Sequence, residues 1–201
     1  MSQEEGIYCI TVRIPWPCDY GTRGLWICAT ILGKMLIDGY LSENFEYRNL
    51  IPDGENFDGY LSWMNNQNNS YIESVREGFS IEELNDFVYL KNHAENAILI
   101  GIFCLNTGDH VGNVKFEPLD FAVGSAWMGI LIGNSNYRGK GFSTEIINTS
   151  CFNLFQVLQI TKIYLGVDPE NIAAVTAYKK CGFEPLEAHE KGGLTMLRQF
   201  A

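Results

Sequence analysis

The sequence predicts a single domain of the α/β (α+β) class, in which helices cover both faces of one mixed sheet. A chain of 201 residues suits one domain with a substantial core. Hydrophobic residues make up 46% of the chain and charged residues 19%, which is typical of a globular protein. Segments with the two-residue period of strands alternate with segments that have the 3.6-residue period of helices. Neither a repeat nor a linker divides them.

The first half of the chain begins with a strand and two helices. Residues 45–50 are expected to form the strand, which a Pro-Asp-Gly sequence ends. Residues 60–64 are expected to form a short helix. A longer helix is predicted to begin after Ser80, because Glu83 stands three residues later and completes a capping box.

The second half of the chain alternates strands with helices. Strands are expected at residues 97–105, 111–116, 126–132 and 162–167. Between the last two of these lies a helix whose inner face is predicted to be Ile147, Cys151, Leu154 and Leu158. A final helix is expected to begin at Asn171 as its N-cap and to end at Gly182, and two strands flank residues 192 and 193.

Charge and cysteine usage exclude several classes of function. The chain has 14 Lys and Arg against 24 Asp and Glu, a formal net charge of −10. Neutralising many phosphates requires clustered cations, so we expect no nucleic-acid partner. The six cysteines are scattered and form no C-x-x-C pair, which predicts free thiols in a reducing cytosol and no metal site.

The N-terminal part of the chain is harder to interpret. Its most apolar run, residues 25–32, is too short to span a bilayer, and Glu4 and Glu5 stand where a basic leader would be. We therefore expect a cytoplasmic protein without a membrane partner. Residues 1–36 are interpreted as an extension of unknown role, followed by one domain over residues 37–201.

The turn before the helix that contains Ile147 is the best candidate for ligand binding. It consists of Arg138, Gly139, Lys140, Gly141, Phe142 and Ser143. Glycines let the backbone approach a ligand closely, and the helix that follows adds unpaired N–H groups and a positive dipole end. A pyrophosphate suits this arrangement, although a tight turn with two exposed cations explains the motif equally well. The P-loop and dinucleotide-binding motifs are absent.

Two linked motifs in this part of the chain resemble those of the GNAT acetyltransferase superfamily. Arg138-x-x-Gly141-x-Ser143 resembles the Q/R-x-x-G-x-G/A signature, with the small residue Ser in place of Gly or Ala. Residues 137–145 are similar to the ribosomal-protein alanine N-acetyltransferase-like branch. The second motif, N-x-x-A-x-x-x-Y-x-K-x-G-F, is matched by Asn171, Ala174, Tyr178, Lys180, Gly182 and Phe183. The resemblance covers about residues 38–201.

The resemblance implies a GNAT fold, with a mixed and mostly antiparallel central sheet, and acetyl-CoA as co-substrate without a metal. The backbone of residues 138–143 is then expected to hold the CoA pyrophosphate. The strand of Ile130, Leu131 and Ile132 is expected to pair its main chain with the pantetheine arm. Asn171 is expected to contact the cofactor, and its role as a helix N-cap is compatible with this. A homodimer is left open.

The resemblance also implies direct attack of a neutral amine on the thioester. Tyr178 is the family's matching residue for giving a proton to the CoA thiolate, although packing in the core is the alternative interpretation. A general base is missing, because the positions where many relatives carry a carboxylate hold Ala126, Trp127 and Met128. Glu117 and Asp120 are interpreted as solvated loop charges, and His110 as a surface residue.

The missing base predicts a weakly basic acceptor. A lysine ammonium, with a pKa of about 10.4, needs strong help to lose its proton, whereas an α-amine near 8 needs little. We therefore expect a primary amine of a small molecule, such as an amino sugar. A protein N-terminal α-amine or a non-catalytic CoA-binding module are the alternatives. Candidate pocket residues are Tyr47, Trp63, Arg76 and Trp127.

Overall fold

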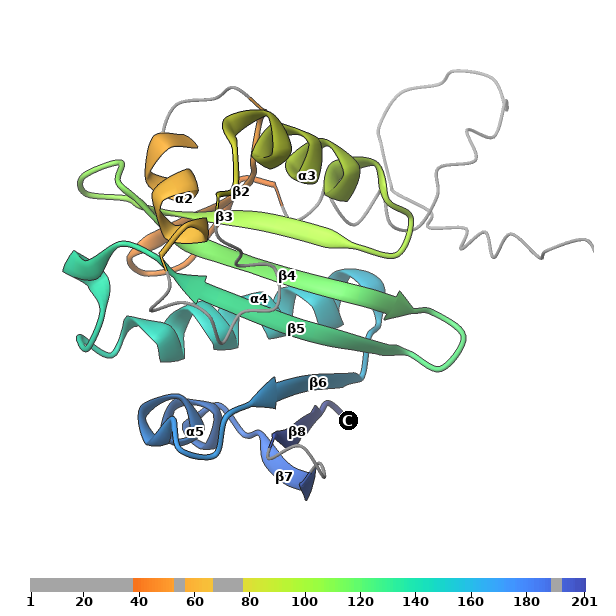
Figure 1. The fold of residues 1–201 in the computed structure, drawn as a ribbon. Coiled ribbons are helices and arrows are strands. Elements are labelled where there is room, and N and C mark those ends of the chain that lie inside the picture. The colour runs from red at the N-terminus through yellow and green to blue at the C-terminus, as the bar shows by residue number, and fades with distance from the viewer. Residues whose placement is uncertain (1–37, 53–56, 67–77, 189–192) are drawn as a thin grey trace, which may run out of the picture.

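The computed structural model of the chain describes residues 38–52, 57–66, 78–188 and 193–201. Eight strands in these ranges form one sheet: β1 (Tyr40–Leu41), β2 (Phe45–Asn49), β3 (Ile98–Cys104), β4 (His110–Asp120), β5 (Ser125–Ile132), β6 (Lys162–Val167), β7 (Glu184–Ala188) and β8 (Leu194–Gln199). Their order across the sheet is β1-β2-β3-β4-β5-β6-β8-β7 (Figure 1). Neighbouring strands run antiparallel except for β5 and β6, which are parallel.

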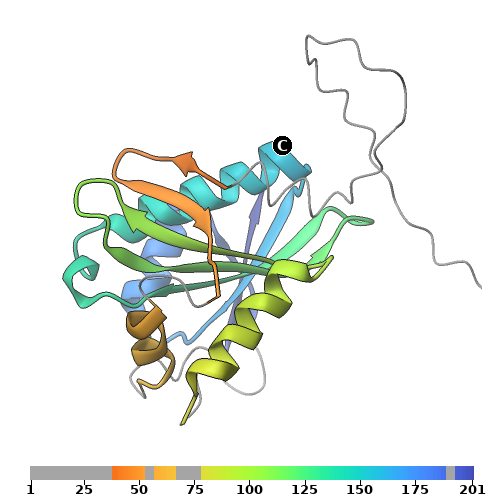
Figure 2. The same cartoon turned by 90° about the horizontal axis from the view of Figure 1, so that it is seen from above.

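Helices cover both faces of this sheet. They are α2 (Phe57–Met64), α3 (Ile81–His93), α4 (Phe142–Leu158) and α5 (Ile172–Lys180), with a 3-10 turn, η2 (Ser135–Tyr137), before α4. The view from above shows α2 and α3 on one face and α4 on the other (Figure 2). Helix α5 packs against α4, where the Cys181 thiol lies 3.7 Å from the carbonyl oxygen of Thr144.

Each face of the sheet has its own hydrophobic core. The larger core lies under α4, whose inward positions Ile147, Cys151, Leu154 and Leu158 are all buried. The smaller core joins α2 and α3 to the opposite face. Burying an apolar side chain stabilises the fold by about 1.5–3 kcal/mol, so these two cores hold α2, α3 and α4 against the sheet.

Local signals in the sequence explain where the helices begin. Ser80 caps α3 and accepts a hydrogen bond from the backbone N–H of Glu83, whose side chain returns one to the N–H of Ser80. Asn171 caps α5 through a 3.1 Å bond from the N–H of Ala174. These two helix starts were predicted, and both are confirmed.

The fold class and nearly all of the predicted elements agree with the structure. The differences are that α2 begins at Phe57, that β4 extends to Asp120, and that neither β1 nor η2 was predicted. The prediction for His110 was wrong, because this side chain is 5% exposed and its ring stacks on Phe103 with 4.7 Å between centroids. The proposed extension, residues 1–36, and the candidate pocket residue Arg76 lie outside the described residues.

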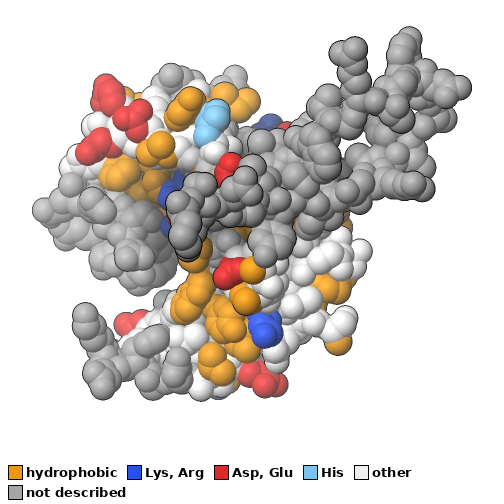
Figure 3. Space-filling view, turned by 90° about the vertical axis from the view of Figure 1, so that its right-hand side faces the viewer, with side chains coloured by type: hydrophobic (Ala, Val, Ile, Leu, Met, Phe, Trp, Pro, Cys, Tyr) orange, Lys and Arg blue, Asp and Glu red, His pale blue; other side chains and the backbone are white. Residues whose placement is uncertain are grey.

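Hydrophobic, acidic and basic side chains are mixed over the face of the molecule drawn in Figure 3.

Cys104, Cys151 and Cys181 are buried free thiols. Burial raises the pKa of Cys151 to about 12, so this thiol stays protonated and packs as a small hydrophobic group. Among the described residues, no helix is long and apolar enough to cross a membrane, and no group of His, Cys, Asp and Glu suits a metal ion.

Candidate active site

The two parallel strands at the centre of the sheet separate partway along their length. β5 and β6 pair only from Ser125 opposite Lys162 to Trp127 opposite Tyr164. Both strands continue beyond this point without pairing to each other, and a cleft of about 740 Å³ lies there. Gly129 and Gly166 line the cleft, and a Cβ atom added to either glycine would meet nothing within 4 Å.

Both faces of the sheet contribute side chains to this cleft. Ala174 and Tyr178 of α5 and its N-cap Asn171 line it together with residues 128–131 of β5. From the opposite face come Tyr60 and Met64 of α2 and Phe87 of α3. Polar residues of β4 complete the wall: Asn113, Lys115 and Glu117.

Four of the predicted site residues thus share one cavity, namely Ile130, Leu131, Asn171 and Tyr178. Tyr178 is half-buried, and its ring contacts that of Phe183 edge to face with 5.9 Å between centroids. This packing fixes the ring at the cleft, so the core-packing interpretation of Tyr178 and its catalytic interpretation are compatible. Ile132 does not line the cleft; its carbonyl oxygen accepts a hydrogen bond from Arg138.

The predicted pyrophosphate turn is open to solvent. Residues 138–141 are exposed, while Phe142 and Ser143 are half-buried. Gly139 and Gly141 have φ angles of 72° and 84°, in the left-handed region that favours glycine. A Cβ atom at either glycine would meet nothing within 4 Å. Gly141 is the N-cap of α4 and has no side-chain cap, in contrast to Ser80 and Asn171, so a ligand has access to this helix start.

Side chains around the turn hold it rigidly on the sheet. Tyr137 donates a hydrogen bond of 2.7 Å to Asp109, and its hydroxyl lies 2.9 Å from that of Thr107. Burial, together with Cys104 and Asp109, raises the pKa of Tyr137 to about 12. Because the phenol stays protonated, it remains a donor to Asp109 throughout the neutral range.

The Arg138 side chain points back to the end of β5. Its Nε donates to the carbonyl oxygen of Ile132 at 2.6 Å, and Nη2 lies 3.4 Å from that of Gly133. The guanidinium group therefore caps the carbonyl groups at the end of β5. The Arg138 N–H donates to the carbonyl oxygen of Ser135, so the N–H groups of residues 139–143 and the exposed side chain of Lys140 are the donors that this turn can offer a ligand.

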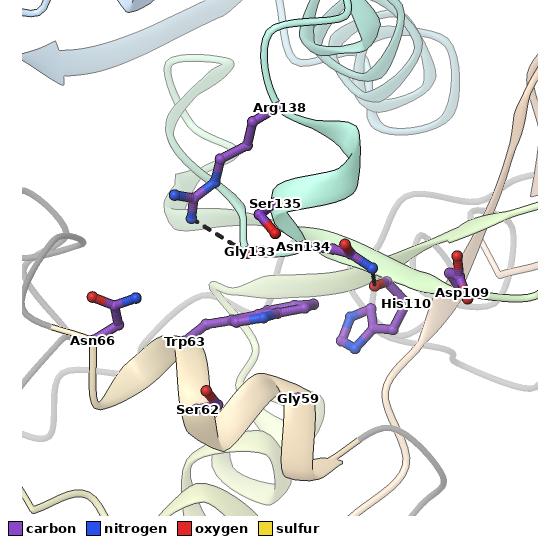
Figure 4. Close-up of a pocket in the computed structure, with 10 residues that line it drawn as sticks. All are labelled: Gly59, Ser62, Trp63, Asn66, Asp109, His110, Gly133, Asn134, Ser135 and Arg138. Carbon is purple, nitrogen blue, oxygen red and sulfur yellow. Dashed lines mark hydrogen bonds between the residues drawn. The ribbon is translucent and has the colours of Figure 1, made fainter.

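A second hollow, of about 430 Å³, lies between α2 and this turn (Figure 4). Trp63 forms its floor, and its indole lies against Gly133, where an added Cβ atom would come within 1.8 Å of the ring. The centroid of the His110 ring lies 4.8 Å from that of the Trp63 ring, and Arg138 lies on the opposite side of the hollow from Trp63. Trp63 therefore lines this hollow, whereas Trp127 lines the larger cleft. The other candidate pocket residue, Tyr47, is fully buried in the core under α4.

Glu117 was expected to be a solvated loop charge, and this was wrong. It lies in β4 and lines the cleft, where its carboxylate oxygens contact the ammonium groups of Lys91 and Lys115. Burial by itself raises the pKa of Glu117, but the hydrogen bonds and charges of the two lysines outweigh it and leave the pKa below its ordinary value. The alternation of Asn113, Lys115 and Glu117 is the signal in the sequence from which this polar stripe could have been predicted.

Glu145 has a structural role that the sequence did not reveal. Its Oε1 accepts hydrogen bonds from the Ser42 hydroxyl at 2.6 Å and from the Asn44 N–H at 2.8 Å, and Oε2 accepts one from the Asn44 side chain at 2.8 Å. The carboxylate thus ties the turn between β1 and β2 to the first turn of α4. Asp120 likewise stabilises a turn, by accepting bonds from the N–H groups of Ala122 and Val123.

The family follows from comparison with known proteins. The model of the acetyltransferase (GNAT) domain matches residues 48–184, which include both motifs up to residue 183 and most of the sheet. The chain is a GNAT acetyltransferase. It is therefore an acetyl-CoA-dependent N-acetyltransferase, and the superfamily predicted from the two motifs is confirmed.

The relatives of this GNAT acetyltransferase include enzymes named for small amines. The chain is 31% identical to spermidine N(1)-acetyltransferase from Vibrio cholerae over 62% of this chain and 73% of that protein. It is 35% identical to aminoglycoside N(6')-acetyltransferase type 1 from Klebsiella pneumoniae over 57% of this chain, and it spans 53% of that relative's length.

Solved structures support the fold. The Vibrio cholerae spermidine N-acetyltransferase, determined with CoA and spermine, superposes with a TM-score of 0.70 and 24% identity, covering 79% of this chain and 96% of that one. A putative ribosomal-protein-serine acetyltransferase from Vibrio cholerae has a TM-score of 0.64 and 18% identity, covering 80% and 96%. At these identities the likeness establishes the GNAT fold.

Proposed function

We propose that this GNAT acetyltransferase moves an acetyl group from acetyl-CoA to the primary amine of a small molecule by direct attack. The observation that supports this most strongly is the single cleft shared by the β5 backbone, Tyr178 and polar residues of β4. Its volume of about 740 Å³ lies within the range of roughly 300–1,000 Å³ that small-molecule sites occupy.

The two substrates are proposed to enter from opposite faces of the sheet. The pyrophosphate of CoA binds the backbone of residues 138–143 at the start of α4. The pantetheine arm runs along Ile130, Leu131 and Ile132, in the stretch of β5 that does not pair with β6. The thioester then lies beside Tyr178 and Asn171, and the amine reaches it from the side of α2 and α3.

Tyr178 is proposed as the acid that protonates the departing CoA thiolate, and a backbone N–H near Ile130 as the donor to the oxyanion. The amine must arrive neutral. Glu117 is a poor base because both of its oxygens contact lysines and its pKa lies below the ordinary value. A weakly basic amine therefore remains the better acceptor.

An amino sugar or a similar small amine is the proposed acceptor class. The relatives named for spermidine and for aminoglycosides support a small amine over a protein N-terminus. The cleft, with its walls formed by α2, α3 and α5, also favours a compact acceptor over an extended peptide. Membership of the ribosomal-protein alanine N-acetyltransferase-like branch and a homodimer stay predictions.

A panel assay tests this proposal. Thiol release from acetyl-CoA is followed with amino sugars, polyamines, aminoglycosides and peptides that have a free N-terminus, each from pH 6 to pH 9. We expect turnover with a small amine that greatly exceeds turnover with any peptide. Preferential acetylation of peptides would instead support the N-terminal alternative, and CoA binding without thiol release would support a non-catalytic module.

A further inference from the structure

Asn113 of β4 places a buried amide in the wall of the cleft. Its side chain is 4% exposed, and it stands opposite Leu131 of β5, on the face of the sheet that α2 and α3 cover. Asparagine is mostly exposed in folded proteins, and a buried polar group nearly always has a hydrogen-bond partner. The hydrogen bonds of this amide therefore bear on what the cleft binds.

His110 fixes the orientation of the amide. The Nε2 atom of His110 lies 2.9 Å from Oδ1 of Asn113 and 3.1 Å from the carbonyl oxygen of Gly112. A carbonyl oxygen can only accept a hydrogen bond, so Nε2 carries the hydrogen, and the atom of Asn113 beside it must be the amide oxygen. The amide nitrogen, Nδ2, therefore lies at the end of the planar group that points away from His110.

The amide nitrogen is a buried donor with two hydrogens. None of the residues that the structure describes accepts a hydrogen bond from it. His110 lines the smaller hollow and Asn113 lines the cleft, so the nitrogen is the end of the amide nearer the cleft. A buried donor without an acceptor costs free energy, which a ligand that brings an acceptor atom recovers on binding.

Tyr60 of α2 supplies a second donor to the same wall. It lines the cleft, is 3% exposed, and meets the His110 ring edge to face with 6.1 Å between centroids. Burial raises the pKa of Tyr60, so its hydroxyl stays protonated at neutral pH and can donate. The part of the cleft wall around His110 thus complements a group with lone pairs.

We infer that the acceptor carries an oxygen, a hydroxyl or a carbonyl, close to its primary amine, and that Asn113 Nδ2 donates a hydrogen bond to this oxygen. His110 is the positioning residue that holds the amide in place. The inference rests on the proposed function and sharpens it. An amino sugar or an aminoglycoside has hydroxyl oxygens beside its amines, whereas protonated spermidine offers N–H donors alone and leaves Nδ2 without an acceptor.

Asn113→Asp is the most specific test, because it keeps the oxygen that accepts from His110 and replaces the donor nitrogen with a second acceptor. Steady-state kinetics compare this variant with wild type on glucosamine, kanamycin and spermidine. We expect kcat/KM for the oxygen-bearing amines to fall about tenfold or more, mainly through KM, because they lose a hydrogen bond and meet a second acceptor. kcat/KM for spermidine should not fall. Each ratio compares two enzymes on one amine, so the amine's own pKa cancels.

Two further variants complete the test. Asn113→Leu removes the donor without adding an acceptor and serves if Asn113→Asp fails to fold, as judged by its melting midpoint. It should show the same loss on the oxygen-bearing amines, with spermidine within about threefold of wild type. Asn148→Asp is the matched control: its Oδ1 accepts from Arg198 at 2.7 Å on α4, away from the cleft, and the change should leave every ratio at the wild-type value.

The possible results separate the inference from the proposed function. A wild-type preference for spermidine, or a folded Asn113 variant that keeps its kcat/KM on glucosamine and kanamycin, would overturn the inference while acetyl transfer to a small amine stands. An equal loss on all three amines would show that Asn113 is only structural, and would also overturn it. An enzyme that acetylates neither these nor other amines would contradict the proposed function itself.

Discussion

The pairings of β5 with its two neighbours in the sheet differ sharply. On one side, β4 and β5 pair from Gly112 opposite Ile132 to Asp120 opposite Ser125, with one irregularity. A Cβ atom added to Gly112 would come within 2.1 Å of the Leu131 carbonyl oxygen. On the other side, pairing with β6 stops at Trp127, and Gly129 faces open space.

The two edges of β5 therefore differ in what they offer. Its edge toward β4 is a structural ladder that pairs along most of the strand and is closely packed at Gly112. Its edge toward β6 leaves backbone donors and acceptors available to a ligand at the centre of the protein, which is uncommon because buried backbone groups are nearly always paired. A cofactor that adds itself as a strand satisfies these groups.

The largest predicted effect concerns chemistry at the open edge. Tyr178→Phe should lower kcat by about 10²-fold or more, because the thiolate loses its proton donor, while the contact with Phe183 is retained. CoA affinity, measured by calorimetry, should stay within about twofold. Wild-type turnover in this variant would show that Tyr178 serves only to pack the core.

Substitutions of Gly112 and Gly129 should have opposite effects: the first should lower stability, and the second should lower activity. Gly112→Ala should lower the free energy of unfolding by about 3 kcal/mol, because the new methyl group collides with backbone of the adjacent strand. Gly129→Val should leave stability within about 1 kcal/mol of wild type yet reduce kcat/KM at least about tenfold, since the side chain enters the cleft. Denaturant unfolding and steady-state kinetics measure the two effects, and equal destabilisation by both changes would contradict the comparison.

A smaller effect is expected where Glu145 ties the turn between β1 and β2 to α4. Glu145→Ala should lower the free energy of unfolding by about 2 kcal/mol, since the Ser42 and Asn44 donors lose a charged acceptor. kcat should change little, because the carboxylate lies away from the cleft. Asp86→Ala, on the exposed side of α3, is the matched control and should stay within about 0.5 kcal/mol.

The smallest effect is the pH dependence that Glu117 contributes. Its pKa is lowered in the folded protein, so its contribution to stability is present above the ordinary glutamate pKa of about 4.3 and is lost as the pH falls below it. Glu117→Gln should therefore melt at a lower temperature than wild type at pH 7, with the difference shrinking toward pH 3. A difference that does not depend on pH would show that the carboxylate charge is irrelevant.

The sequence predicted the fold well and the site in part, for different reasons. Strand and helix positions follow from local periodicity and caps, which is why Ser80 and Asn171 marked helix starts correctly. Tyr178, which the motif predicted as a site residue, lines the cleft. The place of Lys115 and Glu117 in the cleft wall was not predicted, because it depends on where β5 and β6 separate and on Lys91, which approaches from a distant helix. Tertiary packing also placed His110 inside an aromatic cluster, which no local pattern indicates.

The most direct measurement of the central claim is a crystal structure of the chain with CoA. We expect the pantetheine arm between β5 and β6, hydrogen-bonded to the backbone of residues 130–132, with the sulfur beside the Tyr178 hydroxyl and the pyrophosphate on residues 138–143. CoA bound elsewhere, for example in the hollow beside Trp63 and Arg138, with the gap between the central strands left unfilled, would contradict the account.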